Sequence, residues 1–334
     1  HWARTALQPE YSREANAGSN SSKFPIPKMP GTVVTKRITP SQGPRMQHNS
    51  ARTGTKTNII KHRFIMASRL FVTAVAALAP MQAIANPTPY AWQSTKSSPA
   101  NVGETLASRI PPPSGFQRVE AAPDSFAAWL RGLPMKPAGT PVILYNGARK
   151  WRQDVHTDVI DIDVGKRDLQ QCADAVMRLR AEYLWSQKRT RDIGFNYTGG
   201  GHVKFSRWAR GERPSQSGKR WRRRGKADAS YQSFRKYMVQ IFAYAGTYSL
   251  AKELKPVPRN ELRSGDVFIK GGFPGHAVLV TDVVENPATG DRRFLLLQSY
   301  MPAQDMHILK NPSSTDSSPW YPAEFEGDLV TPEW

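Results

Sequence analysis

Cysteine is almost absent from this sequence: the 334 residues contain one, Cys172. A single cysteine forms no internal disulfide, which excludes a disulfide-stabilised scaffold. Two interpretations of Cys172 remain open. One is a small buried side chain, as most free cysteines are, and the other is a catalytic thiolate.

Long hydrophobic runs are also absent, and the one apolar run that stands out, Leu70 to Leu78, is too short to span a bilayer as a mature helix. It lies within residues 66–85, a segment that has a basic residue, Arg69, near its start and Ala83-Ile84-Ala85 at its end. This is the layout of a secretory signal peptide. We therefore expect translation to start at Met66, cleavage after Ala85, and export to the periplasm or the extracellular space.

The segments on either side of this signal have little apolar periodicity. We expect residues 1–65 to be a disordered upstream tail or read-through, with a long targeting prefix as the alternative. Residues 86–108 are polar and rich in Pro and Ser, which is typical of a flexible linker. The remaining residues, 109–334, are long enough to bury one core, and we expect a single domain there.

Acidic residues are scarce: 27 Asp and Glu stand against 47 Lys and Arg, for a formal net charge of +20. Residues 86–334 carry only +10 of this, and residues 204–226 supply +9 of that with ten basic residues and one acidic residue. The rest of the domain is nearly neutral, so a nucleic-acid-binding surface is not indicated. We expect no nucleic-acid partner.

The basic insertion at 204–226 has two interpretations. It is either a solvated, charged insertion or a surface that binds an anionic and partly stackable ligand, because Phe205, Trp208 and Trp221 are interleaved with the charges. Outside the cytoplasm such a ligand is a wall polymer, lipopolysaccharide or a membrane surface that the protein contacts peripherally. The residues that we expect to bind it are Arg207, Trp208, Arg210, Trp221, Arg222, Arg223 and Arg224.

The apolar patterns predict helices first and then strands with a period of two. We expect an α+β fold in which helices cover one face of an antiparallel meander. The predicted helices are residues 124–131, a helix that opens at Asp168 and continues to residue 187, and residues 230–254. The predicted strands are residues 142–145, 159–164, 267–269, 276–282 and 293–300, the last two joined by a hairpin turn at 286–290.

Three polar residues in this pattern suggest a catalytic group. Cys172 lies in the first turn or so of its helix, where the positive end of the helix dipole favours a thiolate. His276 begins a strand, and an imidazole can take the thiol proton. In the hairpin the position opposite His276 is about residue 300, so Gln298 is a diagonal neighbour on the same face and can hold the second ring nitrogen.

Long segments of the sequence resemble known families. The segments DLQQCADAVMRLRAEYLW, GDVFIKGGFPGHAVLV and LLLQSYMPAQDMHILKNP resemble the bacterial family called domain of unknown function 4846, over residues 109–334. More distantly, a cysteine at a helix start followed by Gly-Asp and Gly-His strands resembles the NlpC-type papain-like peptidases and amidases of the cell wall. That second resemblance implies a papain-like fold, with a nucleophile-bearing helix packed on an antiparallel meander sheet.

The NlpC-type resemblance also implies roles for individual residues. Cys172 would be the nucleophile, His276 the base and Gln298 the orienting group, with support from Gln171 at an oxyanion hole and from Asp266 in its turn. We expect no cofactor and no metal, because His156, His202 and His307 show no metal-ligand spacing. The oligomeric state is not predicted.

Two functions follow from these observations. The first is an exported cysteine hydrolase that cleaves an amide bond, for which we expect peptidoglycan stem peptides as the substrate and a Cys172 thioester as the intermediate. The second is a non-catalytic envelope protein that keeps the papain-like scaffold and binds an anionic wall polymer or lipid through its basic insertion.

Overall fold

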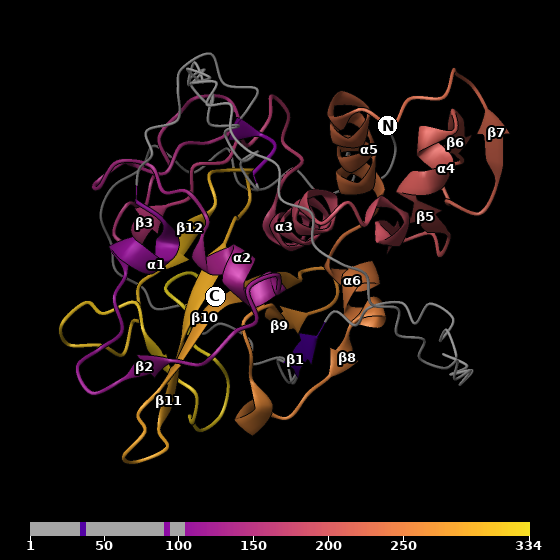
Figure 1. The fold of residues 1–334 in the computed structure, drawn as a ribbon. Coiled ribbons are helices and arrows are strands. Elements are labelled where there is room, and N and C mark those ends of the chain that lie inside the picture. Colours follow the sequence, from indigo (N-terminus) through magenta and orange to yellow (C-terminus); the bar gives the residue numbers. More distant parts are fainter. Residues whose placement is uncertain (1–33, 38–89, 94–103) are drawn as a thin grey trace, which may run out of the picture. The chain divides into compact units, whose positions relative to one another are not determined.

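The structure is a computed structural model that describes residues 34–37, 90–93 and 104–334 (Figure 1). The predicted signal peptide, residues 66–85, lies outside the described residues. The helices are α1 Leu106–Arg109, α2 Phe126–Arg131, α3 Cys172–Ser186, α4 Phe205–Ala209, α5 Tyr231–Tyr244 and α6 Thr247–Glu253, with 3-10 turns at Thr190–Asp192 and Arg259–Glu261.

The largest sheet contains nine strands in which every pair is antiparallel. Its main path runs β3-β12-β11-β10-β9-β1-β8, with β13 paired to β11 and β2 to β10. The predicted meander is therefore formed by β9, β10 and β11, and β12 extends it by one strand. The bounds are β1 Val34–Arg37, β2 Gln117–Arg118, β3 His156–Val159, β8 Lys255–Pro256, β9 Asp266–Lys270, β10 His276–Glu285, β11 Arg292–Gln298, β12 His307–Leu309 and β13 Tyr321–Pro322.

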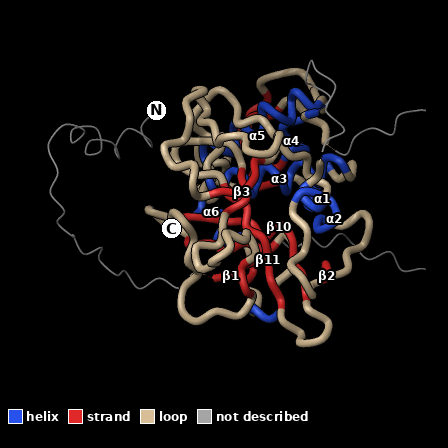
Figure 2. Tube along the Cα trace, turned by 90° about the vertical axis from the view of Figure 1, so that its left-hand side faces the viewer, coloured by secondary structure: helices blue, strands red, loops and turns tan. Residues whose placement is uncertain are grey.

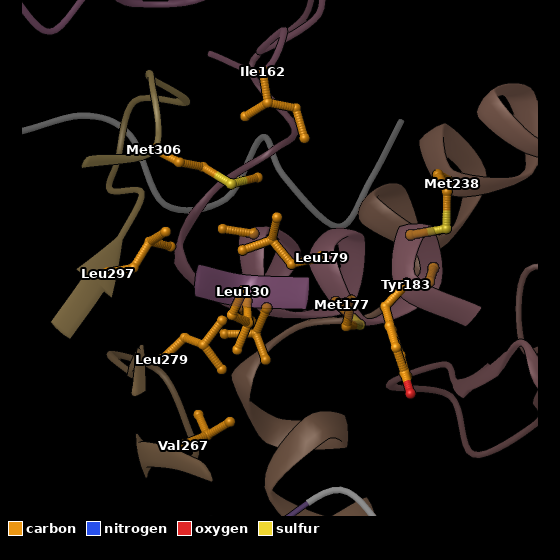
Figure 3. Close-up of a cluster of buried hydrophobic side chains, with 14 of the residues drawn as sticks. Leu130, Ile162, Met177, Leu179, Tyr183, Met238, Val267, Leu279, Leu297 and Met306 are labelled. Atoms are coloured by element: carbon orange, nitrogen blue, oxygen red, sulfur yellow. The ribbon is translucent and has the colours of Figure 1, made fainter. Parts of the chain in front are cut away.

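The two faces of this sheet carry different cores. On one face Val267, Leu279 and Leu297 pack in the larger core with α3, and Figure 3 shows these three side chains extending from the strands toward the helix that carries Met177 and Leu179. On the other face a smaller cluster includes Phe268, Val278, Val280 and Leu296. The arrangement of mixed helices and antiparallel sheet confirms the α+β class.

Helix α3 begins four residues later than predicted, at Cys172. Asp168 does not cap it, because its Oδ1 atom accepts from the backbone N–H of Ala303 (2.7 Å) and from Gln171 Nε2 (2.9 Å). Gln171 is the N-cap instead, and its backbone N–H donates to the carboxylate of Asp174 at 3.1 Å. The shift places Cys172 at the first helical position, where backbone N–H groups have no partner within the helix.

The helix predicted at 230–254 is two helices, α5 and α6. The break falls at Ala245 and Gly246, whose backbones are extended, and the Ser249 hydroxyl accepts from the Gly246 N–H at 3.1 Å. Glycine disfavours a helix interior, and this local hydrogen bond starts a new helix in its place.

Two of the predicted strands differ from the structure: one is not a strand, and the other has different bounds. Residues 142–145 form isolated bridges, Ile143 with Arg149 and Leu144 with Gln304, rather than a strand. The strand predicted at 159–164 is β3, residues 156–159, and only Ile160 beyond it makes a bridge, to Met135. Residues 142–145 are a continuous apolar run and residues 160–164 alternate; both patterns here reflect burial outside a regular strand, which the sequence pattern cannot tell from a strand.

The flexible linker predicted at 86–108 is corrected in its described part. Tyr90 and Trp92 are buried in the larger core, and their polar atoms donate to the carbonyls of Trp129 and Asp161, both at 2.8 Å. Leu106, in α1, is fully buried. Composition alone suggested a linker because aromatic anchors in a Pro/Ser-rich segment leave no periodic pattern.

Residues 1–65, predicted to be disordered, include one described strand, β1. Its backbone pairs with β9 and β8, and Arg37 forms an ion pair with Asp266 at 2.7 Å. The segment Val34-Thr35-Lys36-Arg37 carries no apolar alternation, so its pairing depends on the open edge of β9 rather than on its own pattern.

The basic insertion is folded. It contains β5 His202–Lys204, α4, β6 Glu212–Pro214 and β7 Trp221–Arg223, with β4 Gly194–Asn196 paired to β5 and β6 paired to β7. These hairpins, with α4 and α5, lie on one side of α3 and the large sheet lies on the other (Figures 1 and 2).

Candidate functional site

The amino end of α3 meets the sheet where β10 and β11 part. The pairing of these strands runs from the turn as far as Leu279 and Leu297. Beyond that point, Ser299 donates its hydroxyl to the carbonyl of Gln170, just before α3, at 3.0 Å. Together with the contact from Ala303 to Asp168, this ties the start of the helix to the chain that follows β11.

Cys172 is buried at this junction, with 5% of its surface exposed. The backbone N–H groups of Ala277, Ala173 and Cys172 itself favour its thiolate form, but burial and the charge of Asp174 outweigh them and raise the pKa of the thiol to about 11. The sequence left a buried thiol and a thiolate open, and the helix dipole alone favours the thiolate. The structure favours the thiol, because desolvation is the larger effect.

His276 and Gln298 are brought together by the meander. His276 Nε2 lies 3.1 Å from Gln298 Oε1, and both side chains are buried. Extended beyond Leu279–Leu297, where the observed pairing ends, this register places position 300 opposite His276 and Gln298 diagonal to it, as the hairpin predicts. Burial lowers the pKa of His276 to about 4, and the imidazole is therefore neutral near pH 7.

The contact with Gln298 decides which nitrogen of His276 carries hydrogen. A carboxamide oxygen only accepts, so Nε2 donates to it and Nδ1 keeps a lone pair. The Nδ1 atom is buried and has no hydrogen-bond partner among the described residues. A buried acceptor without a partner is uncommon in proteins and marks a site that can take a proton, although the lowered pKa makes this imidazole a weaker base than a free one.

Tyr300 links the cysteine and the histidine. Its ring lies edge-on to the His276 ring, with the centroids 5.2 Å apart, and the charge of Cys172 contributes to the raised pKa of its phenol. The thiol also contacts the N–H of Ala277, the residue after His276. The structure thus brings His276 and Gln298 into contact at one end of the β10–β11 pair. Cys172 contacts the backbone of Ala277, whose side chain lies in the larger core with α3. His276 instead lines a cavity with Phe268 and Val278 of the smaller cluster, on the other face of the sheet.

Segment 331–334 covers the histidine. The Trp334 ring stacks on the His276 ring at 5.1 Å, and Glu333 Oε2 accepts from Gln298 Nε2 at 2.7 Å. The cavity beside His276 has a volume of about 20 Å³, enough for one water molecule but not for a peptide. Access to the imidazole from this face therefore requires Trp334 to move.

Two predicted support residues lie elsewhere or are already engaged. One N–H of the Gln171 carboxamide donates to Asp168, which holds the side chain against that residue. Asp266 lies at the other end of β9 from Lys270, the strand partner of His276, which is about 13 Å at the usual rise per residue. It accepts from the Arg263 N–H and pairs with Arg37, which is a structural role.

The predicted anion-binding residues separate into two groups. Trp208 is buried and donates to Ser233, and Phe205 is in the core, so neither can stack on a ligand. Arg207 and Arg210 both pair with Glu212, and the Arg207 guanidinium lies over the Trp221 ring at 4.4 Å. Arg222, Arg223 and Arg224 are exposed and form no ion pair with another described residue.

Arg222 and Arg224 line a hollow together with residues that the sequence reasoning did not single out. Its volume is about 340 Å³, and its lining residues are Arg213, Pro214, Ser215, Gln216, Arg220, Arg222 and Arg224. Hairpin pairing of β6 and β7 collects these arginines on one surface. Their joint charge makes this a candidate anion site.

Metal and membrane sites are not found in the described part of the chain. No group of three or more His, Cys, Asp or Glu side chains there can hold a metal ion. None of the described helices is long and apolar enough to cross a bilayer.

Several site residues were missed by sequence reasoning. Lys150, Glu333, Trp334 and His307 come from loops or short strands far from His276 in the sequence, and no motif marks them. Tyr300 was within reach, because the hairpin register places position 300 opposite His276.

The fold and the site define an α+β protein with a buried cysteine at a helix start beside a histidine–glutamine pair on a meander sheet. The chain belongs to the family described as domain of unknown function 4846, which matches residues 106–334. Searches among curated proteins and among solved structures found no match.

Proposed function

We propose that this protein is an exported thiol hydrolase of papain-like type that cleaves an amide bond in peptidoglycan stem peptides. The observation that carries the proposal is the buried Nδ1 of His276, which has a lone pair and no described partner while Gln298 holds Nε2. The thiol of Cys172 lies beside the next residue of the same strand.

The reaction starts from a neutral pair, because the thiol pKa lies well above the imidazole pKa. The proposed reaction requires the imidazole to come within reach of the thiol; proton transfer from Cys172 to His276 Nδ1 then accompanies attack of the sulfur on the amide carbon. The C–N bond then breaks, the amine leaves with the proton from His276, and a thioester remains. Water, with His276 as base, hydrolyses the thioester and restores the thiol.

The backbone N–H groups around the sulfur supply the electrostatic part. The N–H groups of Cys172 and Ala173 lie at the positive end of α3. The N–H group of Ala277 belongs to β10. Such fixed donors can stabilise the negative charge that develops on the substrate oxygen. They replace Gln171 in the role that the sequence suggested for it.

The substrate class rests on the expected export and on the resemblance of the Gly-Asp and Gly-His strands to NlpC-type enzymes. The test is digestion of purified cell walls of several chemistries by the full chain, with the released fragments analysed by mass spectrometry. Cys172→Ala and His276→Gln should release none, and Arg191→Gln, an exposed change far from these residues in sequence, should act as wild type. Identical fragments from wild type and Cys172→Ala would contradict the proposal.

A second function is favoured by the hollow of about 340 Å³ lined by arginines. In this alternative the protein binds an anionic wall polymer or lipid surface through the β6–β7 hairpin and catalyses nothing. Four guanidinium groups around one hollow suit phosphate or carboxylate groups of a polymer.

The two functions predict opposite results for matched variants. If binding is the function, Arg220→Gln/Arg222→Gln/Arg224→Gln abolishes cosedimentation with cell walls or anionic vesicles, and Cys172→Ala leaves it unchanged. A control with equal charge loss at exposed positions, Lys166→Gln/Arg167→Gln/Arg191→Gln, should retain binding. Equal loss in both triple variants would mean that net charge alone, and not the hollow, causes the adhesion.

A further inference from the structure

The carboxamide of Gln298 has a single orientation that satisfies all of its contacts. Its Nε2 atom lies 2.7 Å from Glu333 Oε2 and 3.3 Å from His307 Nε2. A carboxylate only accepts, so the nitrogen and not the oxygen of the carboxamide must face Glu333. The oxygen is left to face His276.

His307 requires the same orientation. Its Nδ1 atom lies 2.9 Å from the carbonyl oxygen of Asp305, which only accepts, so Nδ1 carries the hydrogen. Burial lowers the pKa of His307 to about 3, and the neutral ring therefore presents a lone pair on Nε2 to Gln298. This contact is longer than the one to Glu333 and is the weaker of the two.

Glu333 is itself held in place. Its Oε1 atom pairs with Lys150 Nζ at 2.5 Å, and both side chains are almost completely buried, at 6% and 3% exposed. The pair joins loops at residues 150 and 333, and it fixes a carboxylate against Gln298. Nothing else in the proposed reaction uses this ion pair.

We propose that Glu333, supported by His307, is a positioning residue that sets the tautomer of His276. By holding the nitrogen of the Gln298 carboxamide, Glu333 turns the oxygen to His276, keeps hydrogen on Nε2 and leaves the lone pair on Nδ1. The opposite carboxamide orientation would place a donor against Nε2 and move the hydrogen to Nδ1, which could then accept nothing from Cys172. The assignment rests on the proposed function for its purpose, but the tautomer can be measured without substrate.

The test is ¹⁵N–¹H NMR of the imidazole rings in the full chain labelled with ¹⁵N-histidine, at pH 7 and without substrate. His276 is assigned by the loss of its signals in His276→Gln. In wild type we expect His276 to carry hydrogen on Nε2 alone. In Lys150→Met/Glu333→Met, which leaves no buried charge, we expect Nδ1–H signals of His276 to appear, and more strongly when His307→Phe is added.

Two further variants keep the test decisive. Glu333→Gln is isosteric and can donate as well as accept, so we expect a mixture of tautomers even if the double variant does not fold. Lys150→Arg keeps the carboxylate and its counter-charge, and the wild-type tautomer should persist. The proposal is overturned if wild-type His276 carries its hydrogen on Nδ1, or if the folded Glu333 variants keep Nε2–H alone.

This outcome is independent of the hydrolase proposal. The expected tautomers combined with inactive wild-type protein in wall digestion would reject the hydrolase and leave Glu333 as the residue that orders Gln298. Active wild-type protein with an unchanged tautomer in the Glu333 variants would reject the role of Glu333 and leave the hydrolase standing.

Discussion

His276 and Gln298, which lie 22 residues apart in the sequence, meet at 3.1 Å where two strands of the meander separate. The contact is buried, and it leaves one imidazole nitrogen as a donor and the other as an acceptor. The buried thiol of Cys172 reaches the same strand end from α3. Five predictions follow from this geometry and from its surroundings.

The first prediction concerns the reactivity of Cys172. Because its pKa is raised to about 11, iodoacetamide labelling should be slow at pH 7 and should increase steadily up to pH 11. Peptide mapping by mass spectrometry measures the rate at Cys172. Fast labelling below about pH 8 would instead indicate the thiolate that the helix dipole by itself favours.

The second prediction concerns stability in acid. His276 and His307 have pKa values lowered to about 4 and about 3, so below the unfolded value of 6.5 the unfolded chain binds protons that the folded protein does not. Stability is therefore fully present above pH 6.5 and is lost as the pH falls toward 4, by on the order of 3 kcal/mol for each histidine. Urea unfolding at pH 7 and pH 5 measures this, and His307→Phe should show a smaller difference between the two.

The third prediction concerns the cover over the imidazole. Trp334→Ala removes the stacked ring, so diethyl pyrocarbonate should modify His276 faster than it does in wild type. Mass spectrometry of the His276 peptide gives the rate. The change Trp151→Ala removes an exposed aromatic ring and serves as the control, since it should leave that rate unchanged.

The fourth prediction concerns the Lys150–Glu333 pair. Lys150→Met leaves a buried carboxylate without its counter-charge and should cost about 3–5 kcal/mol of unfolding free energy. Lys150→Met/Glu333→Met removes both charges and should cost less than the single change, although Gln298 loses a partner. Denaturant melts of the two variants compare them directly. A double variant less stable than the single one would contradict this view of the pair.

The fifth prediction concerns β1. Cleavage after Ala85 would remove this strand, expose the edge of β9 and leave the buried carboxylate of Asp266 without Arg37. The chain 86–334 should therefore be less stable than the full chain, and Arg37→Ala in the full chain should cost roughly 3 kcal/mol. Arg45→Ala, outside the described residues, provides a charge-matched comparison. N-terminal sequencing of the protein isolated from cells shows which form exists.

The sequence predicted the elements that have strong periodicity. It missed the elements that are stabilised by contacts with residues distant in sequence. The strands from Asp266 to Gln298 were predicted within a few residues, because alternating burial on a meander leaves a period of two. Tyr90, Trp92 and β1 were missed, since an aromatic anchor or a short edge strand needs a partner that is distant in sequence.

The candidate site, like the fold, was predicted from the sequence only where its contacts are local along the chain. The hairpin turn and strand lengths were enough to place Gln298 beside His276, since register in a hairpin is local. The protonation state of Cys172 was not predicted, because it depends on how deeply the helix start is buried rather than on its dipole. Trp208 was assigned to a surface for a related reason: one charged stretch of sequence folds into both buried and exposed positions.

By itself, the sequence determined the α+β class, the meander, and the order of Cys172, His276 and Gln298, because each is encoded in spacing along a short stretch of chain. Only the tertiary structure decided that Lys150, His307, Glu333 and Trp334 surround the histidine and that the thiol is neutral. The physical reason is that desolvation and hydrogen-bond orientation depend on groups that folding brings together from remote parts of the chain.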